Sequence, residues 1–294
     1  MNGTGTQVDP YLITTCQEFV TCLKTLHGYA KLTKNLDCNE DGLYEWNFGN
    51  QQVRNGDLEI DFNNHYLANV FIPEDQVFCN GYYNGGKFTF KNGAIVNVYE
   101  QGAKFFTNDV VYFNFALSIN ANTFTDCVIQ AWGSGVVFDY CNVRIENTNV
   151  NNTEYWFSCE NNVFFATNSK INVNGKINEA LCVGRYNSSD YARAFKNCLI
   201  EGKLTGGLSN RAILLFRSQV AGASCIGVIW KCDVTECESK AIWEKSCNGV
   251  NIIDSSMIGE NMTYTQDSVL LTDTQIRSHT KLDEIGFDTV EVID

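Results

Sequence analysis

Hydrophobic and polar positions follow a recurring six-residue pattern along much of the chain. It consists of an apolar residue, any residue, Asn, Asp or Ser, a small residue, any residue and a second apolar residue. The clearest copy is Phe195-Lys196-Asn197-Cys198-Leu199-Ile200. Further copies begin at Phe90, Phe124, Phe138, Ile253 and Leu271, and the copy at Phe138 has Tyr140 in the polar position. Such repetition predicts a solenoid, in which each coil buries its apolar face against its neighbours.

The intervals between copies indicate the length of one coil. The two large intervals, 138 to 195 and 195 to 253, span 57 and 58 residues, so each fits two coils of about 29 residues. The shorter intervals of 34, 14 and 18 residues suggest that the copy at 138 or 271 belongs to a second wall of one coil. A sandwich of β-hairpins is the alternative, since Asn-Gly turns favour hairpins. Polar ladders at coil corners explain the repeated Asn or Asp better.

The N-terminal segment has a helical pattern instead. Thr15 and Glu18 fit a capping box, in which both side chains satisfy free amides of the first turn. One apolar face then follows at helical spacing, made of Cys16, Phe19, Cys22, Leu23 and Leu26. We expect an amphipathic helix from about residue 15 to 27, ending near Gly28. Because a solenoid needs its open end covered, this helix is predicted to be the cap.

Composition supports a β-rich protein with a buried core. Of the 294 residues, 44% are hydrophobic and 13% aromatic, and only 2 are proline, so no Pro-rich linker divides the chain. The net charge of −13 argues against nucleic acid as a partner and against an anionic membrane surface. Residues 1–6 lack the pattern of a secretory signal, and no apolar run approaches the roughly 20 residues of a transmembrane helix. We therefore expect synthesis in the cytoplasm and no membrane insertion.

The 13 cysteines are an odd number, and no Cys-x-x-Cys motif occurs. The three histidines lie far from any cysteine pair with metal-ligand spacing, so neither a metal nor another cofactor is expected. Cys127, Cys141 and Cys198 occupy the small position of the repeat. Free thiols behave as small buried hydrophobes. We expect reduced, buried cysteines that stack from coil to coil.

Two segments near the N-terminus resemble a known class of proteins. Residues 9–15 read Asp-Pro-Tyr-Leu-Ile-Thr-Thr, and residues 29–37, after the helix, read Tyr-Ala-Lys-Leu-Thr-Lys-Asn-Leu-Asp. This opening resembles that of many phage tail, tail-fibre and appendage proteins, and of bacterial surface adhesins, although Asn35 stands where those sequences usually carry Asp. The resemblance implies a right-handed parallel β-helix and a virion or surface role. It supplies no catalytic residues.

Sugar cleavage is the first catalytic chemistry to consider in such a fold. Glycoside hydrolysis needs two carboxylates that face one cleft. Adjacent coils could present Asp126 with Asp139, or Asp233 with Glu236, but such pairs arise by chance in an acidic solenoid. The Asp-Asp and Gly-His-Gly motifs of polygalacturonase-like enzymes are absent. No catalytic residue is assigned, and the pattern favours a protein without enzymatic activity.

Binding to a glycan is the better-supported candidate. Aromatic residues next to Asn and Asp suit carbohydrate, because rings stack on sugars while amides bond hydroxyls. Insertions between coils often form the binding face of a solenoid. The candidate residues are Tyr155, Trp156, Arg185, Tyr186, Asn187, Asp190 and Tyr191. The alternative is that Trp156 and Phe157 belong to the core and that the rest is a solvated loop.

The sequence thus predicts an all-β, right-handed parallel β-helix with a short N-terminal capping helix. Residues 1–40 would hold a strand and the cap, 41–280 the coils, and 281–294 a C-terminal strand or arm. We expect a structural or adhesive phage virion protein, in a tail, fibre or appendage, that contacts other virion proteins and a host surface glycan. The alternatives are a tailspike-like polysaccharide depolymerase and a bacterial surface adhesin. A homo-oligomer, most simply a trimer, would multiply weak receptor contacts.

Overall fold

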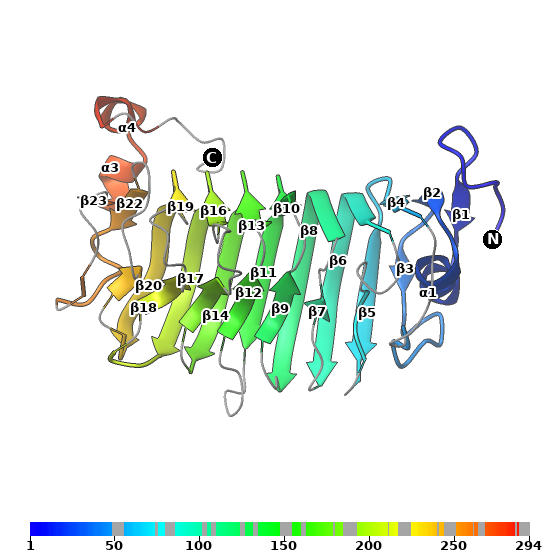
Figure 1. Cartoon of the computed structure of the whole chain (residues 1–294), viewed down its shortest axis with the longest axis horizontal. Helices are drawn as coiled ribbons and strands as arrows, with labels where there is room; N and C mark the ends of the chain where they lie inside the picture. The colour runs from blue at the N-terminus through cyan, green and yellow to red at the C-terminus, as the bar shows by residue number, and fades with distance from the viewer. Residues whose placement is uncertain are drawn as a thin grey trace.

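The protein is a stack of parallel strands capped at one end by a helix (Figure 1). The computed structural model describes residues 1–48, 56–73, 76–79, 86–101, 105–106, 110–123, 127–131, 135–147, 155–159, 163–178, 180–184, 193–210, 212–216, 225–239, 241–243, 251–260, 262–263, 268–285 and 287. The strands form three walls, each a ladder of strands from successive coils. The predicted fold class, a parallel β-helix with an N-terminal capping helix, is confirmed.

The first two walls belong to one continuous sheet. Wall 1 contains β1 (Tyr11–Ile13), β2 (Gly28–Leu32), β4 (Leu58–Asp61), the first parts of β6 (Phe88–Gln101) and β8 (Val110–Thr123), β10 (Gly135–Asp139), β13 (Val163–Thr167), β16 (Arg193–Lys196) and β19 (Cys225–Ile226). Wall 2 contains β3 (Leu36–Asp37), β5 (Tyr66–Ile72), the later parts of β6 and β8, β11 (Asn142–Asn147), β14 (Lys170–Ile177), β17 (Leu199–Gly206), β20 (Ile229–Cys237), β22 (Asn251–Asp254) and β23 (Ser268–Leu271).

Wall 3 is a separate sheet that closes the coils from β6 to β20. It contains β7 (Phe105–Phe106), β9 (Cys127–Ala131), β12 (Tyr155–Cys159), β15 (Ala180–Gly184), β18 (Ala212–Phe216) and β21 (Ala241–Trp243). The register gives the coil length directly. Lys170 pairs with Leu199, 29 residues on, and Leu199 pairs with Ile229, 30 residues on. The coil length expected from the sequence is therefore confirmed in this part of the stack.

The repeated polar residue turns the chain from wall 1 into wall 2. Asn92, Asn114, Asn168 and Asn197 all have positive φ angles of 49–57° there. Asn is one of the few residues that adopts this left-handed conformation readily. Their amides also bond from coil to coil: Asn168 Nδ2 donates to Asp139 Oδ1 at 2.9 Å, and Asn197 Nδ2 donates to Asn168 Oδ1 at 3.3 Å. The expected polar ladder at the coil corners is thus present.

Not every predicted copy of the repeat forms this corner. The copies at 90, 138 and 195 do, whereas residues 124–126 lie outside the described part of the chain. The copy at Ile253 ends β22, and in the copy at Leu271 the residue Thr272 caps a helix instead of turning a coil. Three further coils departed from the pattern and were not recognised. Ala166 is small in the apolar position of one coil, and Phe115 is bulky in the small position of another. In the third coil, Gly227 and Val228 stand in the polar and small positions.

The residues in the small position of the corner form a column of buried thiol and hydroxyl groups, each of which bonds to backbone carbonyls. Cys141 Sγ contacts Asp139 O and Tyr112 O, both at 3.3 Å. Ser169 Oγ and Cys198 Sγ repeat this arrangement, each reaching a carbonyl two residues earlier and a carbonyl of the preceding coil. Burial raises the pKa of both the Cys141 and Cys198 thiols to about 12. No disulfide is assigned to the nine cysteines whose side chains the structure describes, and eight of them are buried.

Alternation along the wall 2 strands separates an interior from an exterior. On β17, Ile200 lies in the main core with 0% exposure, while its neighbour Leu199 belongs to a second, outer apolar cluster. Successive side chains of a strand point to opposite faces, which explains the split. The interior continues as stacked rings: the Phe90, Tyr112 and Phe138 centroids are 5.2 and 4.9 Å apart from coil to coil.

The N-terminal helix α1 (Cys16–Thr25) lies at one end of the stack (Figure 1). Thr15 is its N-cap and accepts a hydrogen bond from Glu18 N at 3.1 Å. The Glu18 carboxylate bonds the Thr14 amide at 2.8 Å instead of the cap residue itself, so the reciprocal half of the capping box is displaced by one residue. Phe19 inserts between Trp46 and Phe62, with ring centroids 5.9 and 5.7 Å away, and thereby covers the open end of the core.

Of the expected C-terminal strand or arm, residues 281–294, the described part begins as a helix, and residues 286 and 288–294 lie outside the described residues. Residues 273–284 form two short helices, α3 (Asp273–Ile276) and α4 (His279–Glu284), capped by Thr272 and Ser278. They cover an apolar row on the outside of wall 2, and the resulting outer cluster contains Leu199, Ile229, Ile252, Leu271, Ile276, Leu282 and Phe287. The coils also begin earlier than residue 41, because β2 and β3 already pair within walls 1 and 2.

Candidate functional site

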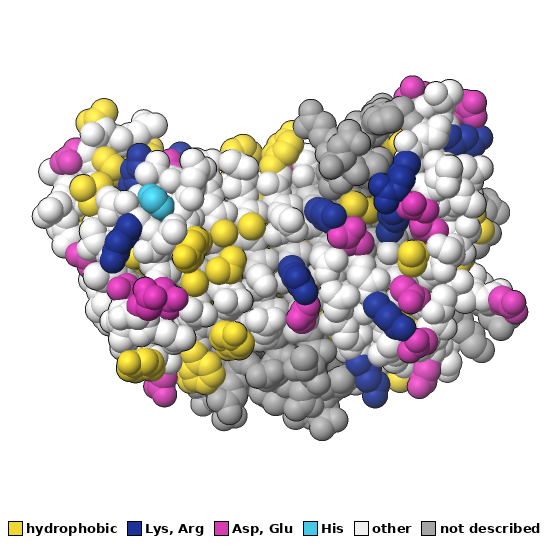
Figure 2. All heavy atoms as spheres, turned by 180° about the vertical axis from the view of Figure 1, so that it is seen from behind, with side chains coloured by type: hydrophobic (Ala, Val, Ile, Leu, Met, Phe, Trp, Pro, Cys, Tyr) yellow, Lys and Arg dark blue, Asp and Glu magenta, His cyan; other side chains and the backbone are white. Residues whose placement is uncertain are grey.

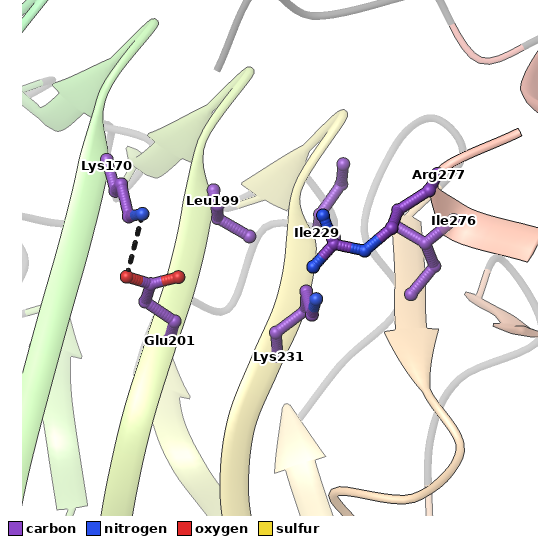
Figure 3. A pocket seen from close by; sticks show the side chains of 7 residues that line it. All are labelled: Lys170, Leu199, Glu201, Ile229, Lys231, Ile276 and Arg277. Atoms are coloured by element: carbon purple, nitrogen blue, oxygen red, sulfur yellow. Dashed lines mark ion pairs between the residues drawn. The ribbon is translucent and has the colours of Figure 1, made fainter. Parts of the chain in front are cut away.

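A small pocket opens where α3 meets the outer face of wall 2 (Figure 3). Its volume is about 130 Å³. It is lined by Lys170, Leu199, Glu201, Ile229, Lys231, Ile276 and Arg277. On the face of the molecule shown in Figure 2, charged side chains of both signs gather over the C-terminal half, whereas hydrophobic ones are prominent over the other half.

The strand register brings the pocket residues together. Lys170, Leu199 and Ile229 occupy equivalent positions on β14, β17 and β20. Glu201 on β17 and Lys231 on β20 lie two residues after Leu199 and Ile229, so they point to the same outer face. The strand register places these two residues side by side. The helix α3 adds Ile276 from its last position, and Arg277 follows as its C-cap. Three coils and a helix far along the chain thus contribute to one pocket.

Ion pairs connect most of the charged groups around the pocket. Lys170 Nζ lies 2.9 Å from Glu201 Oε1, which also accepts a bond from Asn172 Nδ2 at 3.3 Å. Lys231 forms an ion pair with Asp273 Oδ1, and Arg277 Nε lies 2.9 Å from Asp273 Oδ2. Bonding by Lys231, and next by Arg277, holds the pKa of Asp273 below its usual value. The ion pair of Asp273 with Lys231 thereby connects α3 to β20.

Some polar atoms at the pocket remain available to a ligand. Among the described residues, Nη1 and Nη2 of Arg277 have no partner, and neither has Glu201 Oε2. The three apolar side chains, Leu199, Ile229 and Ile276, supply a surface on which a ligand can lie. A pocket with such an apolar floor and a few convergent polar groups is suited to binding a small molecule.

The geometry gives less support to hydrolysis. A glycosidase needs one carboxylic acid whose pKa is raised so that it can protonate the leaving group. At the pocket, Lys231 lowers the pKa of Asp273 instead. Of the pairs considered from the sequence, Asp139 serves the corner ladder through Thr167 and Asn168. Asp233 bonds the Thr235 amide and hydroxyl, which lowers its pKa, and Glu236 pairs with Lys203 at 2.5 Å.

Of the seven glycan-binding residues expected from the sequence, Trp156 is the one whose side chain lies in the described part of the structure. Trp156 has 0% exposure and lies in the main core with Phe157, so it does not stack on a surface ligand. Both residues belong to β12, so wall 3 contributes them to the buried part of the stack. Tyr155 is placed only as a strand residue of β12, and nothing is described of its side chain. The remaining candidates, Arg185, Tyr186, Asn187, Asp190 and Tyr191, lie outside the described residues.

An exposed aromatic pair at the corner was missed by sequence reasoning. Phe113 and Tyr140 are 43% and 54% exposed, and their rings lie 6.0 Å apart in an edge-to-face arrangement. Tyr140 stands where the repeat normally places Asn or Asp, and it adopts the same positive φ, 53°. Exposed Asn114 and partly exposed Asp139 flank the pair in sequence. The departure of Tyr140 from the repeat was the signal that could have identified it.

None of the helices in the described part of the chain has the length and apolar composition needed to cross a membrane. In the same part, no group of three or more His, Cys, Asp or Glu side chains is arranged to hold a metal ion. Comparison with other proteins adds no assignment, because no family model and no curated protein sequence matches the chain.

Proposed function

We propose that the chain is a structural and adhesive protein of a phage particle, a component of a tail, fibre or appendage that binds a glycan on the host surface. The opening that resembles phage tail and appendage proteins supports the assignment to a particle. The β-helix is compatible with this role and with others. The observation that carries the adhesive part is the exposed pair of Phe113 and Tyr140 on the side of the stack.

The pair has the chemistry of a sugar-binding surface. Aromatic rings combine a large apolar face with low side-chain entropy, and sugar rings stack on such faces. The amide of Asn114 and the carboxylate of Asp139 lie next to the pair in sequence and can bond hydroxyl groups. A polar Asn or Asp would satisfy the corner equally well, as it does in Asn92 and Asn168. The turn itself therefore does not require aromatic residues at these two positions.

A single shallow surface of this kind binds weakly. Symmetric assembly multiplies weak contacts, because each further site binds at a high effective concentration. We therefore propose a homotrimer whose lateral faces carry the aromatic pairs, with other virion proteins as partners of the stack.

The adhesive function can be tested by restoring the repeat at the corner. Phe113→Thr and Tyr140→Asn, made together, introduce the residues that stand at equivalent positions as Thr167 and Asn168. Folding should be retained, while binding of the purified protein to host cells and to a glycan array should be lost. Tyr99→Ser is the matched control, because Tyr99 is 40% exposed and lies along wall 2 rather than at the corner.

Three results would contradict the proposal or parts of it. Undiminished cell binding by the double variant would remove the aromatic pair as the adhesive surface. Release of new reducing ends from host polysaccharide would favour a depolymerase. Antibodies against the protein should label phage particles in electron micrographs, and labelling of bacterial surfaces alone would favour an adhesin.

A further inference from the structure

We infer that the pocket between wall 2 and α3 binds a carboxylate-bearing sugar residue of an acidic glycan. This inference rests on the proposed adhesive function and names a chemical class for its ligand. It concerns a different part of the surface from the aromatic pair, because the pocket is built from β14, β17, β20 and α3.

The charge balance at the pocket favours an anionic ligand. Lys170, Lys231 and Arg277 contribute three positive charges. Glu201 and Asp273, which pair with them, contribute two negative charges, so one positive charge remains. This local excess occurs in a chain with a net charge of −13. One ligand carboxylate would neutralise it, whereas a phosphate dianion would leave a negative charge next to Glu201.

The position of Arg277 favours a carboxylate in particular. In Figure 3 the guanidinium extends from the end of α3 over Ile229, toward the ion pair of Lys170 and Glu201. Asp273 occupies only Nε, so both terminal amino groups of the guanidinium remain free for a ligand among the described residues. A guanidinium can bond the two oxygens of a carboxylate at once, which gives both strength and orientation.

The rest of the pocket suits a sugar ring better than a simple anion. Leu199, Ile229 and Ile276 provide an apolar surface for the C–H groups of a ring. The free Oε2 of Glu201 can accept a hydrogen bond from a sugar hydroxyl. The volume of about 130 Å³ is well below the roughly 300–1,000 Å³ of pockets that enclose drug-sized ligands. The pocket therefore fits one sugar residue, and the remainder of the polysaccharide would extend along the open face.

Calorimetric titration of the intact chain can test this assignment. The probes are tetragalacturonate, a hyaluronan tetrasaccharide and sialyllactose, which carry carboxylates on different sugars. The methyl ester of tetragalacturonate removes the charge, and acetate and inorganic phosphate test for simple anion binding. We expect at least one acidic saccharide to bind, its neutral ester to bind at least about tenfold more weakly, and the two small anions to bind more weakly still.

Two substitutions separate the guanidinium from general charge effects. Arg277→Gln should weaken binding of the acidic saccharide about tenfold or more. Arg277→Lys should restore only part of this affinity, because an ammonium group cannot bond both carboxylate oxygens in the planar geometry of a guanidinium. Arg144→Gln is the matched control: Arg144 is a 60% exposed arginine on wall 2 paired with Glu146, while Arg277 is 62% exposed. Lys231 still holds Asp273 in the Arg277 variants, so their melting temperatures should stay near that of the wild type.

Each alternative outcome overturns the inference. It fails if none of the acidic saccharides binds, if the methyl ester binds equally well, or if acetate or phosphate binds as tightly as the saccharide. It also fails if Arg144→Gln is as damaging as Arg277→Gln. These failures would leave the adhesive function standing if Phe113→Thr with Tyr140→Asn still abolishes cell binding. Saccharide binding that depends on Arg277, without antibody labelling of phage particles, would instead retain the pocket and reject the virion role.

Discussion

Three consecutive residues of β17 should respond in three different ways to substitution. Leu199 is 6% exposed in the outer cluster beneath α3 and α4, and Ile200 is 0% exposed in the main core. The side chain of Glu201 is 27% exposed and paired with Lys170. The perturbations are Leu199→Asp, Ile200→Asp and Glu201→Ala. Because the three sites are adjacent in sequence, differences between them report only on where each side chain lies.

The structure sets the magnitude of each effect. Ile200→Asp loses about 1.5–3 kcal/mol of apolar burial and adds about 3–5 kcal/mol for an uncompensated charge in the core. The sum is comparable to the whole stability of a typical domain, about 5–15 kcal/mol, so this variant should not fold. Leu199→Asp loses about 1.5–3 kcal/mol, but its charge becomes hydrated once α3 and α4 detach. Glu201→Ala breaks a surface ion pair and should cost less than about 1 kcal/mol.

Urea denaturation followed by circular dichroism measures these differences, and limited proteolysis with mass spectrometry locates them. We expect Ile200→Asp in the insoluble fraction. Leu199→Asp should keep its β-sheet spectrum but be cleaved rapidly near residues 272–285, and Glu201→Ala should match the wild type in both assays. Equal tolerance of Ile200→Asp and Glu201→Ala would refute the assigned alternation. Global unfolding by Leu199→Asp would show that the outer cluster is part of the main cooperative unit.

Four further predictions concern the corner, the helices and the assembly. Cys198 should resist thiol reagents in the native protein and react after denaturation, since burial raises its pKa to about 12; extensive native disulfides would contradict this. Asn168→Ala should lower the free energy of unfolding by about 2 kcal/mol or more, through two lost ladder bonds and a left-handed Ala, whereas exposed Asn142→Ala should be nearly neutral. The bond from Lys231 lowers the pKa of Asp273 in the folded state, so its contribution is present at neutral pH. That contribution should be lost as the pH falls below about 4, where proteolysis of α3 should accelerate. Light scattering should give three times the 33.0 kDa mass of one chain, and a stable monomer at micromolar concentration would exclude the trimer.

The sequence by itself determined the features that depend on local conformation and on repetition. Asn197 adopts a positive φ because Asn tolerates the left-handed conformation, and the copies of the repeat at Phe90 and Phe195, which both carry Asn there, are recognisable for that reason. The apolar spacing of the N-terminal helix likewise needs no partner to be recognised, and Phe19 and Leu23 are buried as expected. Coil length followed from the same repetition, since strands that stack in parallel keep a nearly constant number of residues per coil.

Only the tertiary structure decided which outward rows are covered and which remain exposed. Leu199 and Ile229 look like ordinary strand residues, and their burial depends on helices that fold back from residues 273–284. The pocket likewise depends on a pairing of Lys231 with Asp273 across 42 residues of chain, which no local pattern encodes. The placement of Trp156 inside wall 3 was also undetermined, because an aromatic residue next to polar ones suits either a core or a surface. Packing against neighbouring coils selects between the two, and that information is contained in the register of the strands rather than in any single segment.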